Sequence, residues 1–348
     1  MPTFDRVAIR ARVSCDVLCR LVALFLGETT VLSWVELGGG SSKLAYRVET
    51  PTRTAVLYVL PPTIIGQFER AARDAAYELA FAGALAGGGV PVPRRYPALD
   101  GQGFATAEIG GIPCFLSLHA FVTGQIVLVL DRVRLQAAAA TVARAHVVGR
   151  GLRLAPARMG GFHLAARIAS EAWRPRRPPA ETALTKDARD LLGTFAETAT
   201  AARARILGAH GETERFPIHG DLGPRNLLWD GLRLAGVLDL DECHTDGAWV
   251  DLALALEDLC RHDADGAAAT AASFLGDYAQ VVELPPLDLE LTLQFWLFRQ
   301  AAGGYDRLAG LVEPSVRMPD RLEAAERRLS VVHQIRAFLA ERHHLGRG

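Results

Sequence analysis

The hydrophobic and polar positions of the first 120 residues follow the patterns of short strands and two helices. Short runs that alternate or are rich in Val and Leu, bounded by Gly, Pro and Ser, are typical of strands. Apolar residues at a period near 3.6 predict helices. The expected strands are 31–37, 43–50, 55–60, 104–108 and 114–119, and the expected helices are 5–26 and 68–86. This part of the chain should be a small, mostly antiparallel sheet with a helix laid on it.

After Gly124 the pattern becomes mainly helical. Helices are predicted over 135–148 and 187–207 and through most of the chain from residue 250 to the end. Two short strands, 226–229 and 234–238, follow a distinctive loop, and a proline-rich surface linker is expected at 173–179. The fold class is therefore α+β with two lobes. A lobe with a sheet (1–119) joins a larger, helical lobe (120–348) near residues 119–125.

Composition narrows the class of protein. The chain has 348 residues, half of them hydrophobic, which suggests about two domains with ample apolar core. A formal net charge of −1 argues against nucleic acid as the main partner. We expect no membrane association, because no apolar run approaches the roughly 20 residues that a spanning helix needs. Five cysteines without a C-x-x-C pair are typical of free thiols, so a cytoplasmic location is expected.

Lysine is scarce. Of the 38 Lys and Arg residues, only Lys43 and Lys186 are lysine. A genome that favours arginine codons explains the bias itself, but the position of each remaining lysine becomes informative.

The segment 218–242 carries the candidate chemistry. Asp221 lies in a loop between Gly220 and Gly223, where a carboxylate can accept a proton from a hydroxyl group. Asn226 follows five residues later, and Asp239 comes at the end of an apolar strand. Carboxylate and amide oxygens suit Mg²⁺, which also keeps water and phosphate oxygens as ligands.

The arrangement Asp-x4-Asn with a later Asp resembles the protein-kinase-like phosphotransferases. The sequence has His219-Gly-Asp221 in place of His-Arg-Asp, and a late Asp251-Leu-Ala. This combination resembles the aminoglycoside phosphotransferase and homoserine/choline kinase family. The resemblance implies a two-lobe protein-kinase-like fold that uses ATP, or another nucleoside triphosphate, and Mg²⁺. It assigns Asp221 and Asn226 to catalysis and Asn226 and Asp239 to the metal. Asp251 and His219, and the His146 of an "L-A-x-L-H"-like helix, would be structural.

The resemblance extends to a glycine loop between the first two strands. Its backbone N–H groups could bind phosphate, and the implied nucleotide-binding positions are Gly39, Gly40, Ser41, Ser42 and Lys43. Alone, these glycines would equally fit a plain turn. Glu78, on the next helix, falls where the family keeps the glutamate that pairs with a phosphate-binding lysine, although by itself it fits an exposed helix charge.

The third strand departs from the family pattern. Where a lysine normally contacts the α- and β-phosphates, the sequence has Tyr58. Three explanations are open. Lys43 has taken over this role, or Arg47 or Arg53 serves instead, or the nucleotide site is degraded and the protein is a pseudokinase-type binding module. The intact catalytic motifs favour retained activity.

The acceptor is left open by the sequence. A hydroxyl-bearing small molecule is expected first. The alternative is a Ser/Thr kinase that acts on a protein or biosynthetic peptide, together with a partner enzyme. Asp241 is expected to support the metal or the substrate, or to be an exposed loop acid. The acidic residues after the Asp-Leu-Ala motif could attract a cationic substrate or form an exposed helix face; they are Glu257, Asp258, Asp263 and Asp265.

Overall fold

The structure is a computed structural model. It describes residues 7–38, 43–60, 68–154, 175, 184–261, 264–311 and 316–345. Four of the predicted nucleotide-binding positions lie outside the described residues: Gly39, Gly40, Ser41 and Ser42. So does the predicted linker at 173–179, apart from residue 175.

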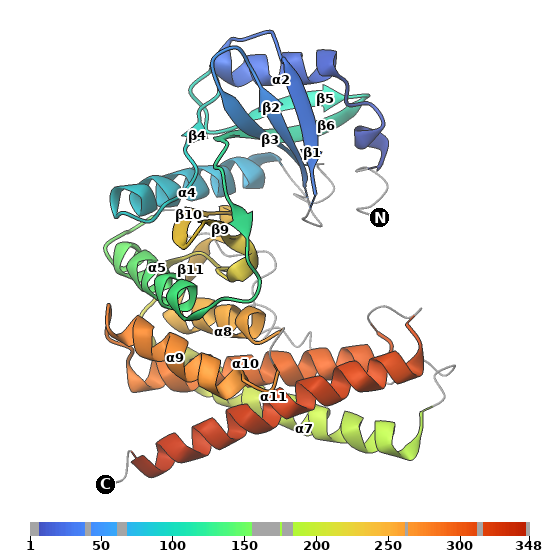
Figure 1. Ribbon diagram of the computed structural model, residues 1–348, viewed down its shortest axis with the longest axis vertical. Helices are drawn as coiled ribbons and strands as arrows, with labels where there is room; N and C mark the ends of the chain where they lie inside the picture. Colours follow the sequence, from blue (N-terminus) through green and yellow to red (C-terminus); the bar gives the residue numbers. More distant parts are fainter. Residues whose placement is uncertain are drawn as a thin grey trace.

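The N-terminal part is built around a six-stranded antiparallel sheet (Figure 1). Its order is β1-β2-β3-β6-β4, with β5 also paired to β6. The strands are β1 (Ser33–Leu37), β2 (Leu44–Glu49), β3 (Thr54–Leu60), β4 (Arg95–Tyr96), β5 (Ala105–Ile109) and β6 (Ile112–Ala120). On β2 the side chains alternate between buried and half-buried, as a strand with one face on a core requires. The predicted strand positions are confirmed.

Two helices flank this sheet. Helix α2 (Cys15–Leu26) packs over the face away from the helical part, and α4 (Phe68–Gly87) lies between the sheet and the rest of the chain (Figure 1). The predicted helix over 5–26 is wrong in extent. Ser14 interrupts it, because the Ser14 hydroxyl accepts the N–H of Val17 at 3.3 Å and so caps a new helix.

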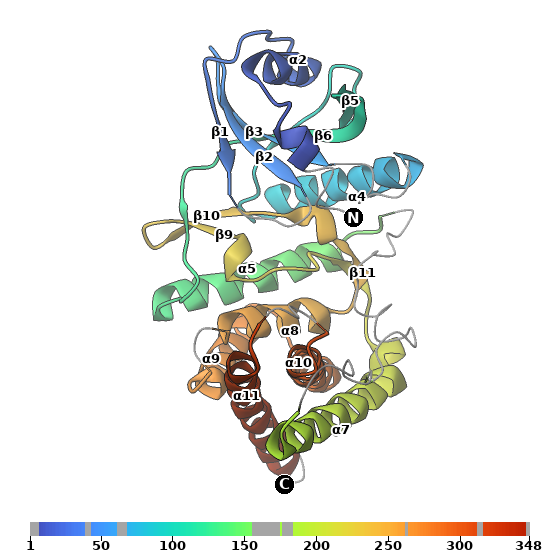
Figure 2. The same ribbon diagram turned by 90° about the vertical axis from the view of Figure 1, so that its right-hand side faces the viewer.

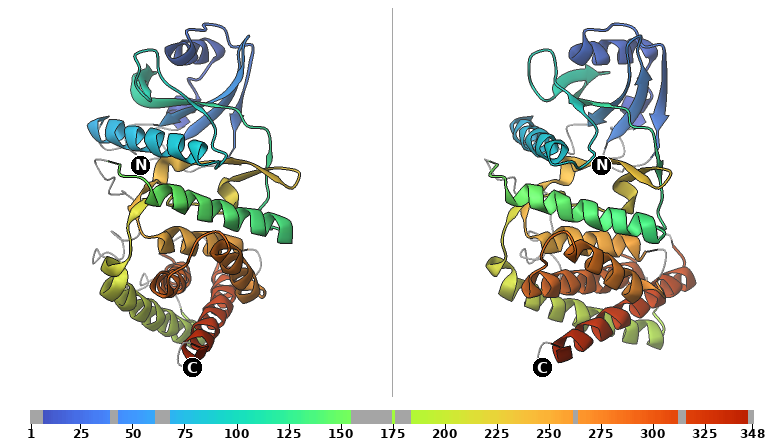
Figure 3. Two further views of the ribbon diagram at one scale, coloured as in Figure 1. Left: turned by 90° about the vertical axis from the view of Figure 1, so that its left-hand side faces the viewer. Right: turned by 60° about the vertical axis from the view of Figure 1, so that its left-hand side comes forward.

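The C-terminal part is mainly helical (Figure 2). Its helices are α5 (Arg132–Arg150), α7 (Lys186–Ala209), α8 (Ala248–Leu259), α9 (Ala267–Ala279), α10 (Pro286–Leu308) and α11 (Met318–Leu345). Helix α10 packs against α7, α8 and α11, and this packing is visible from both directions in Figure 3. None of the described helices is both long and apolar enough to cross a membrane.

Short strands form the upper layer of the helical part. They are β7 (Gln125–Ile126), β8 (Phe216–Ile218), β9 (Leu227–Asp230), β10 (Arg233–Val237) and β11 (His244–Asp246). They make a three-stranded sheet, β10-β9-β7, and a pair, β11-β8. The chain leaves β6 at Ala120, and five residues later β7 already pairs with β9. The division into lobes of 1–119 and 120–348 stays a prediction, which this crossing point favours.

Two hydrogen bonds tie the N-terminal part to these short strands. The Val237 N–H donates to the Pro91 carbonyl at 2.6 Å. The hydroxyls of Tyr77, on α4, and Thr245, on β11, are 2.9 Å apart. The end of β10, where Asp239 follows, is therefore held beneath α4.

Candidate active site

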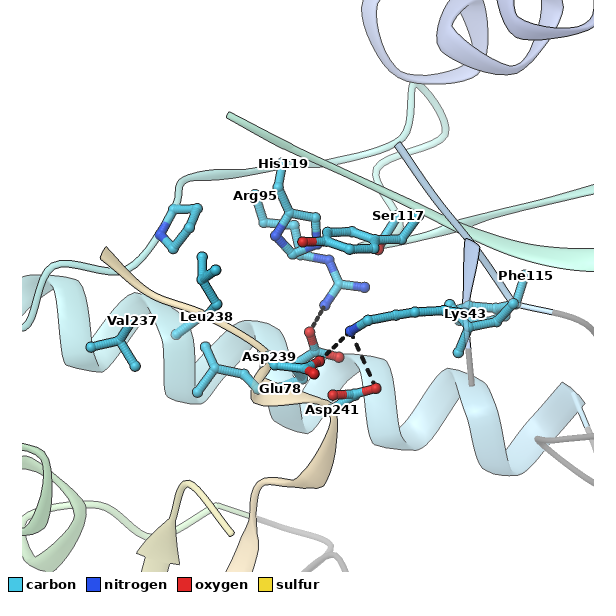
Figure 4. A pocket seen from close by; sticks show the side chains of 15 residues that line it. Lys43, Glu78, Arg95, Phe115, Ser117, His119, Val237, Leu238, Asp239 and Asp241 are labelled. Carbon is cyan, nitrogen blue, oxygen red and sulfur yellow. Dashed lines mark hydrogen bonds and ion pairs between the residues drawn. The ribbon is translucent and has the colours of Figure 1, made fainter. Parts of the chain in front are cut away.

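A cleft of about 670 Å³ lies between the N-terminal sheet and the segment that follows β10 (Figure 4). From the N-terminal part it is lined by Lys43, which immediately precedes β2, and by residues of β3, β4, β6 and α4, and from the C-terminal part by residues 237–241. Its polar lining residues are Lys43, Tyr58, Glu78, Arg95, Ser117, His119, Asp239 and Asp241. Two cations and three carboxylates therefore converge on one space.

Asp221 and Asn226 lie together in the loop between β8 and β9. The Asn226 amide nitrogen donates to the Asp221 carbonyl at 2.7 Å and to the Asp221 carboxylate at 3.1 Å. Gly220 makes the loop possible. Its φ is 83°, and a Cβ at this position would lie 2.3 Å from the Glu242 carbonyl oxygen, so only glycine fits.

Burial raises the pKa of the half-buried Asp221 carboxyl, and the opposing effects of Arg225, His219 and Asn226 do not cancel it. Arg225 is itself paired with Asp258, 2.6 Å away. Asp221 is thus a partly desolvated carboxylate that is held by one amide, the environment in which a carboxylate becomes a better proton acceptor.

Asp251, on α8, holds the backbone of this loop. Its carboxylate accepts the N–H of His219 at 2.9 Å and the N–H of Gly220 at 2.6 Å. The His146 ring nitrogen lies 3.2 Å from the same carboxylate. His219 in turn contacts the Leu238 carbonyl at 2.9 Å. The structural positions predicted for these residues are confirmed, and together they link the loop to the segment that carries Asp239.

Asp239 occupies a sharp turn between the end of β10 and a short 3₁₀ segment (Leu240–Glu242). Its φ of 66° makes it the one residue other than glycine in the left-handed region among those described. Such conformations are uncommon and concentrate at functional sites. Burial and the neighbouring Asp241 raise the pKa of Asp239, and the charge of Lys43 opposes this rise and favours the ionised carboxylate.

Lys43 reaches Asp239 from the opposite side of the cleft (Figure 4). Its ammonium forms ion pairs with Asp239 and, at 3.3 Å, with Asp241. It also lies 4.6 Å from the centre of the Tyr58 ring. Burial lowers the pKa of Lys43, but the charges of Asp241 and Asp239 raise it further, and the net pKa lies above the ordinary value. Lys43 is therefore a fixed cation in the cleft.

The two arginines considered as substitutes for the missing lysine do not line the cleft. Arg47 pairs with Glu49 at 3.0 Å, and Arg53 lies 3.8 Å from Glu28. Of the three explanations, the relocation to Lys43 is the one that the geometry favours.

Glu78 lines the cleft, but its partner is not a lysine. Arg95, on β4, pairs with Glu78 at 3.1 Å, and the Arg95 side chain is only 3% exposed. Sequence reasoning missed Arg95, as it missed His119, whose ring packs edge-on against Tyr58 at 5.1 Å. Burial and the charges of Arg95 and Lys43 hold the pKa of His119 well below its usual range, so this ring is neutral.

The acidic residues outside the main motif differ from expectation. Asp241 is half-buried rather than an exposed loop acid; it lies in the 3₁₀ segment and faces Lys43. Glu257 and Asp258 are not an exposed helix face. Both side chains are 7% exposed, and they pair with Arg299 and Arg225. Asp263 lies outside the described residues.

The donors around Asp239 fit a hard divalent cation. The Asn226 amide nitrogen donates hydrogen bonds to Asp221. The Asn226 Oδ1 is therefore the side-chain atom of this residue that can bind a metal. Asp239 and Asp241 already share a cation, the Lys43 ammonium. The described residues hold no group of three or more His, Cys, Asp or Glu side chains that could bind a metal by themselves. Oxygen ligands supplied by phosphate would therefore have to complete the set.

Comparisons agree with this geometry. The model of the phosphotransferase enzyme family (APH) matches residues 33–284. The chain therefore belongs to this family, and it is a kinase-like phosphotransferase that acts on hydroxyl groups. A search of curated protein sequences gives no match.

Similar solved structures share the whole fold. An aminopropanol kinase associated with a microcompartment is 18% identical, with a TM-score of 0.70 over 94% of this chain and 98% of the other. An amicoumacin kinase, in complex with AMP-PNP and Ca²⁺, is 14% identical, with a TM-score of 0.66 over 94% and 96%. A spectinomycin phosphotransferase, in complex with ADP and spectinomycin, is 12% identical, with a TM-score of 0.59 over 93% and 98%. The two-lobe fold predicted from the sequence is confirmed.

Proposed function

We propose that the protein transfers the γ-phosphoryl group of ATP, with Mg²⁺, to a hydroxyl group of a small molecule. The observation that carries the proposal is the ion pair between Lys43 and Asp239, residues 196 positions apart that meet in one cleft. It brings together a cation suited to phosphate and a carboxylate suited to a metal, even though β3 has no lysine. The similar structures include small-molecule kinases in complex with ADP or AMP-PNP, which supports both ATP and a small acceptor.

Each residue has a distinct role in this proposal. The Asp221 carboxylate takes the proton of the acceptor hydroxyl, whose oxygen forms a new bond to the γ-phosphorus while the bond to the bridging oxygen breaks. Asn226 orients Asp221 through its amide nitrogen. Lys43 binds the α- and β-phosphate oxygens, as the strand lysine does in related phosphotransferases. Asn226 and Asp239 would hold Mg²⁺, which when bound neutralises charge on the phosphates. Catalysis rests mainly on positioning the two substrates and on stabilising the charge of the transition state.

Asp221→Asn tests the proposal. With radiolabelled ATP, Mg²⁺ and a panel of hydroxyl compounds, we expect transfer by the wild type and a loss of roughly 10²- to 10⁴-fold in the variant, because the proton acceptor is gone. Asp230→Asn is the matched control, since Asp230 is 62% exposed on β9 and pairs only with Arg233 at 2.9 Å among the described residues.

Equal transfer by the wild type and Asp221→Asn would reject the catalytic role. Including Ser- and Thr-containing peptides in the panel decides between a small-molecule and a peptide acceptor. Absence of both transfer and nucleotide hydrolysis in the wild type would instead favour a catalytically silent nucleotide- or ligand-binding module.

A further inference from the structure

The charged side chains that line the cleft form two separate sets of ion pairs (Figure 4). Lys43 is paired with Asp239 and Asp241. Arg95 is paired with Glu78, and 3.1 Å separate Arg95 Nη1 from Glu78 Oε1. Two cations therefore serve three carboxylates among the described lining residues. With fewer cations than carboxylates, each pairing determines which partner is left for the others.

The pair of Arg95 and Glu78 is buried and joins two elements of the N-terminal part. The Arg95 side chain is 3% exposed, and the Glu78 side chain is 17% exposed. The backbone of Arg95 is fixed by the sheet, because Arg95 on β4 pairs with His119 on β6. Glu78 lies on α4. Since a buried charge that loses its partner is strongly destabilised, Glu78 needs a cation at this place.

Tyr58 and His119 show that both sets of ion pairs act on one small space. Their rings pack edge-on with centres 5.1 Å apart, and the Lys43 ammonium lies 4.6 Å from the centre of the Tyr58 ring. Burial raises the pKa of Tyr58, the charge of Lys43 opposes the rise, and carboxylates that include Glu78 add to it. Burial lowers the pKa of His119, and the charges of Arg95 and Lys43 lower it further. Glu78 and Arg95 therefore lie around the same two rings as Lys43.

The presence of Arg95 determines which carboxylates Lys43 can serve. With Arg95 in place, Glu78 has a cation of its own, and Lys43 is paired with the two carboxylates that follow β10. Without Arg95, Lys43 would be the remaining Lys or Arg among the described lining residues. Glu78 would then compete with Asp239 for the Lys43 ammonium.

We propose that Arg95 is a positioning residue of the phosphotransfer site, because by neutralising Glu78 it keeps Lys43 beside Asp239 and available to the phosphates of the nucleotide. The inference rests on the proposed function, in which Lys43 binds the α- and β-phosphate oxygens. Arg95 acts through Glu78 and Lys43 and does not contact the nucleotide. Because β3 carries Tyr58 and no lysine, the cleft uses one cation for the phosphates and a second one for Glu78.

Binding of AMP-PNP with Mg²⁺ to the full-length protein, measured by calorimetry, tests this role without an acceptor. We expect Arg95→Met to weaken binding roughly tenfold or more, because Glu78 then draws Lys43 away from the phosphates. Adding Glu78→Gln to Arg95→Met should bring the affinity back to within about threefold of the wild type, since the competing carboxylate is gone. Arg94→Met is the matched control, because Arg94 is the exposed neighbour of Arg95 and does not line the cleft; it should bind as the wild type does.

Lys43→Ala distinguishes positioning from a purely structural role. In a protein that already carries Lys43→Ala, Arg95→Met should have almost no further effect on AMP-PNP binding, because no ammonium is left to be drawn away. A structural role, or a direct contact between Arg95 and phosphate, would make the two losses additive. Additive losses would overturn the proposal. So would a double variant Arg95→Met/Glu78→Gln that binds as weakly as Arg95→Met alone.

Thermal unfolding shows whether each variant is folded. If Arg95→Met is not folded, Arg95→Gln takes its place, since it keeps a hydrogen-bond donor for Glu78 but no charge. It should also weaken AMP-PNP binding, and an unchanged affinity counts against the proposal. Failure of the wild type to bind AMP-PNP would overturn it as well. If Asp221→Asn transfers phosphate as well as the wild type, the proposed function fails, and the binding measurements still decide the role of Arg95.

Discussion

A positive charge in the cleft beside Asp239 comes from Lys43, ahead of β2, rather than from the β3 position where the resemblance led us to expect a lysine. Tyr58 on β3 pairs with Ala45 on β2. Lys43 lies two residues before Ala45 and immediately precedes β2. The Lys43 ammonium then lies over the Tyr58 ring, beside Asp239 and Asp241. The cleft therefore contains a lysine charge although β3 carries Tyr58.

Lys43→Ala should raise the KM for ATP and lower kcat/KM. A lost charge-assisted hydrogen bond costs about 1.5–3 kcal/mol, which corresponds to a roughly 10- to 150-fold loss in kcat/KM. Steady-state kinetics with varied ATP at saturating acceptor measure the effect. Adding Tyr58→Lys to the variant should recover part of the loss, because it returns the charge to β3.

Arg47→Ala and Arg53→Ala are the matched controls for this experiment. Both remove a cation from the N-terminal sheet region, on β2 or immediately before β3, without touching the cleft, so their ATP kinetics should stay within twofold of the wild type. A larger loss in either control than in Lys43→Ala would contradict the relocation.

The sequence predicted the residues whose spacing is fixed by the chemistry and missed those placed only by packing. Asp221, Asn226 and Asp239 follow a motif in which each role demands one residue type. Arg95 could not be found, because β4 is two residues long and arginine is too common in this chain for any pattern to single it out. The left-handed turn at Asp239 is likewise invisible without the backbone.

At the scale of helices and strands, α8 links the separate parts of the site. Asp251 near its start holds the catalytic loop, and Asp258 near its end holds Arg225. Hydrophobic positions that recur every 3.6 residues or every second residue predicted most helices and strands to within a few residues. They failed at 5–26, because the Ser14 cap overrides a continuous apolar stripe. They also misjudged Glu257 and Asp258, because the burial of α8 depends on distant helices.

Asp251→Asn should destabilise the protein by about 3 kcal/mol at pH 7, since an amide nitrogen would face buried backbone donors. Burial raises the pKa of Asp251, but His146 and the His219 backbone lower it further, so the net pKa in the folded protein is depressed. The stabilisation is therefore present above the unfolded value of about 3.9 and is lost as the pH falls through the folded pKa. The difference between wild type and variant should be large at pH 7 and narrow below about pH 4.

Urea unfolding of both proteins at pH 7 and pH 3.5 measures this difference. Asp230→Asn, at an exposed ion pair, should change stability by no more than about 0.5 kcal/mol at either pH. A difference between wild type and Asp251→Asn that does not depend on pH would show that the ionised carboxylate is not what stabilises the loop.

At the scale of the whole molecule, the two-lobe fold could be predicted from the sequence, but the cavities between its helices could not. Three ordered motifs and the change from sheet to helix were enough for the family and the fold. A cavity lined by Glu257, Gln300 and Arg328 needed the structure, because these residues come from three helices that begin at Ala248, Pro286 and Met318. No local pattern brings these faces together.

Because lysine is scarce in this chain, acylation of Lys43 can probe the contact between the lobes. An amine-acylating reagent can modify only two lysine side chains in the chain, Lys43 and the exposed Lys186. The Lys43 ammonium is pinned by two carboxylates and its pKa is raised, so at pH 8 Lys43 should be acetylated much more slowly than Lys186. Asp239→Asn should speed modification of Lys43 and leave Lys186 unchanged. Peptide mass spectrometry measures these acetylation rates without knowledge of the acceptor. Equal Lys43 acetylation rates in the wild type and Asp239→Asn would refute the ion pair.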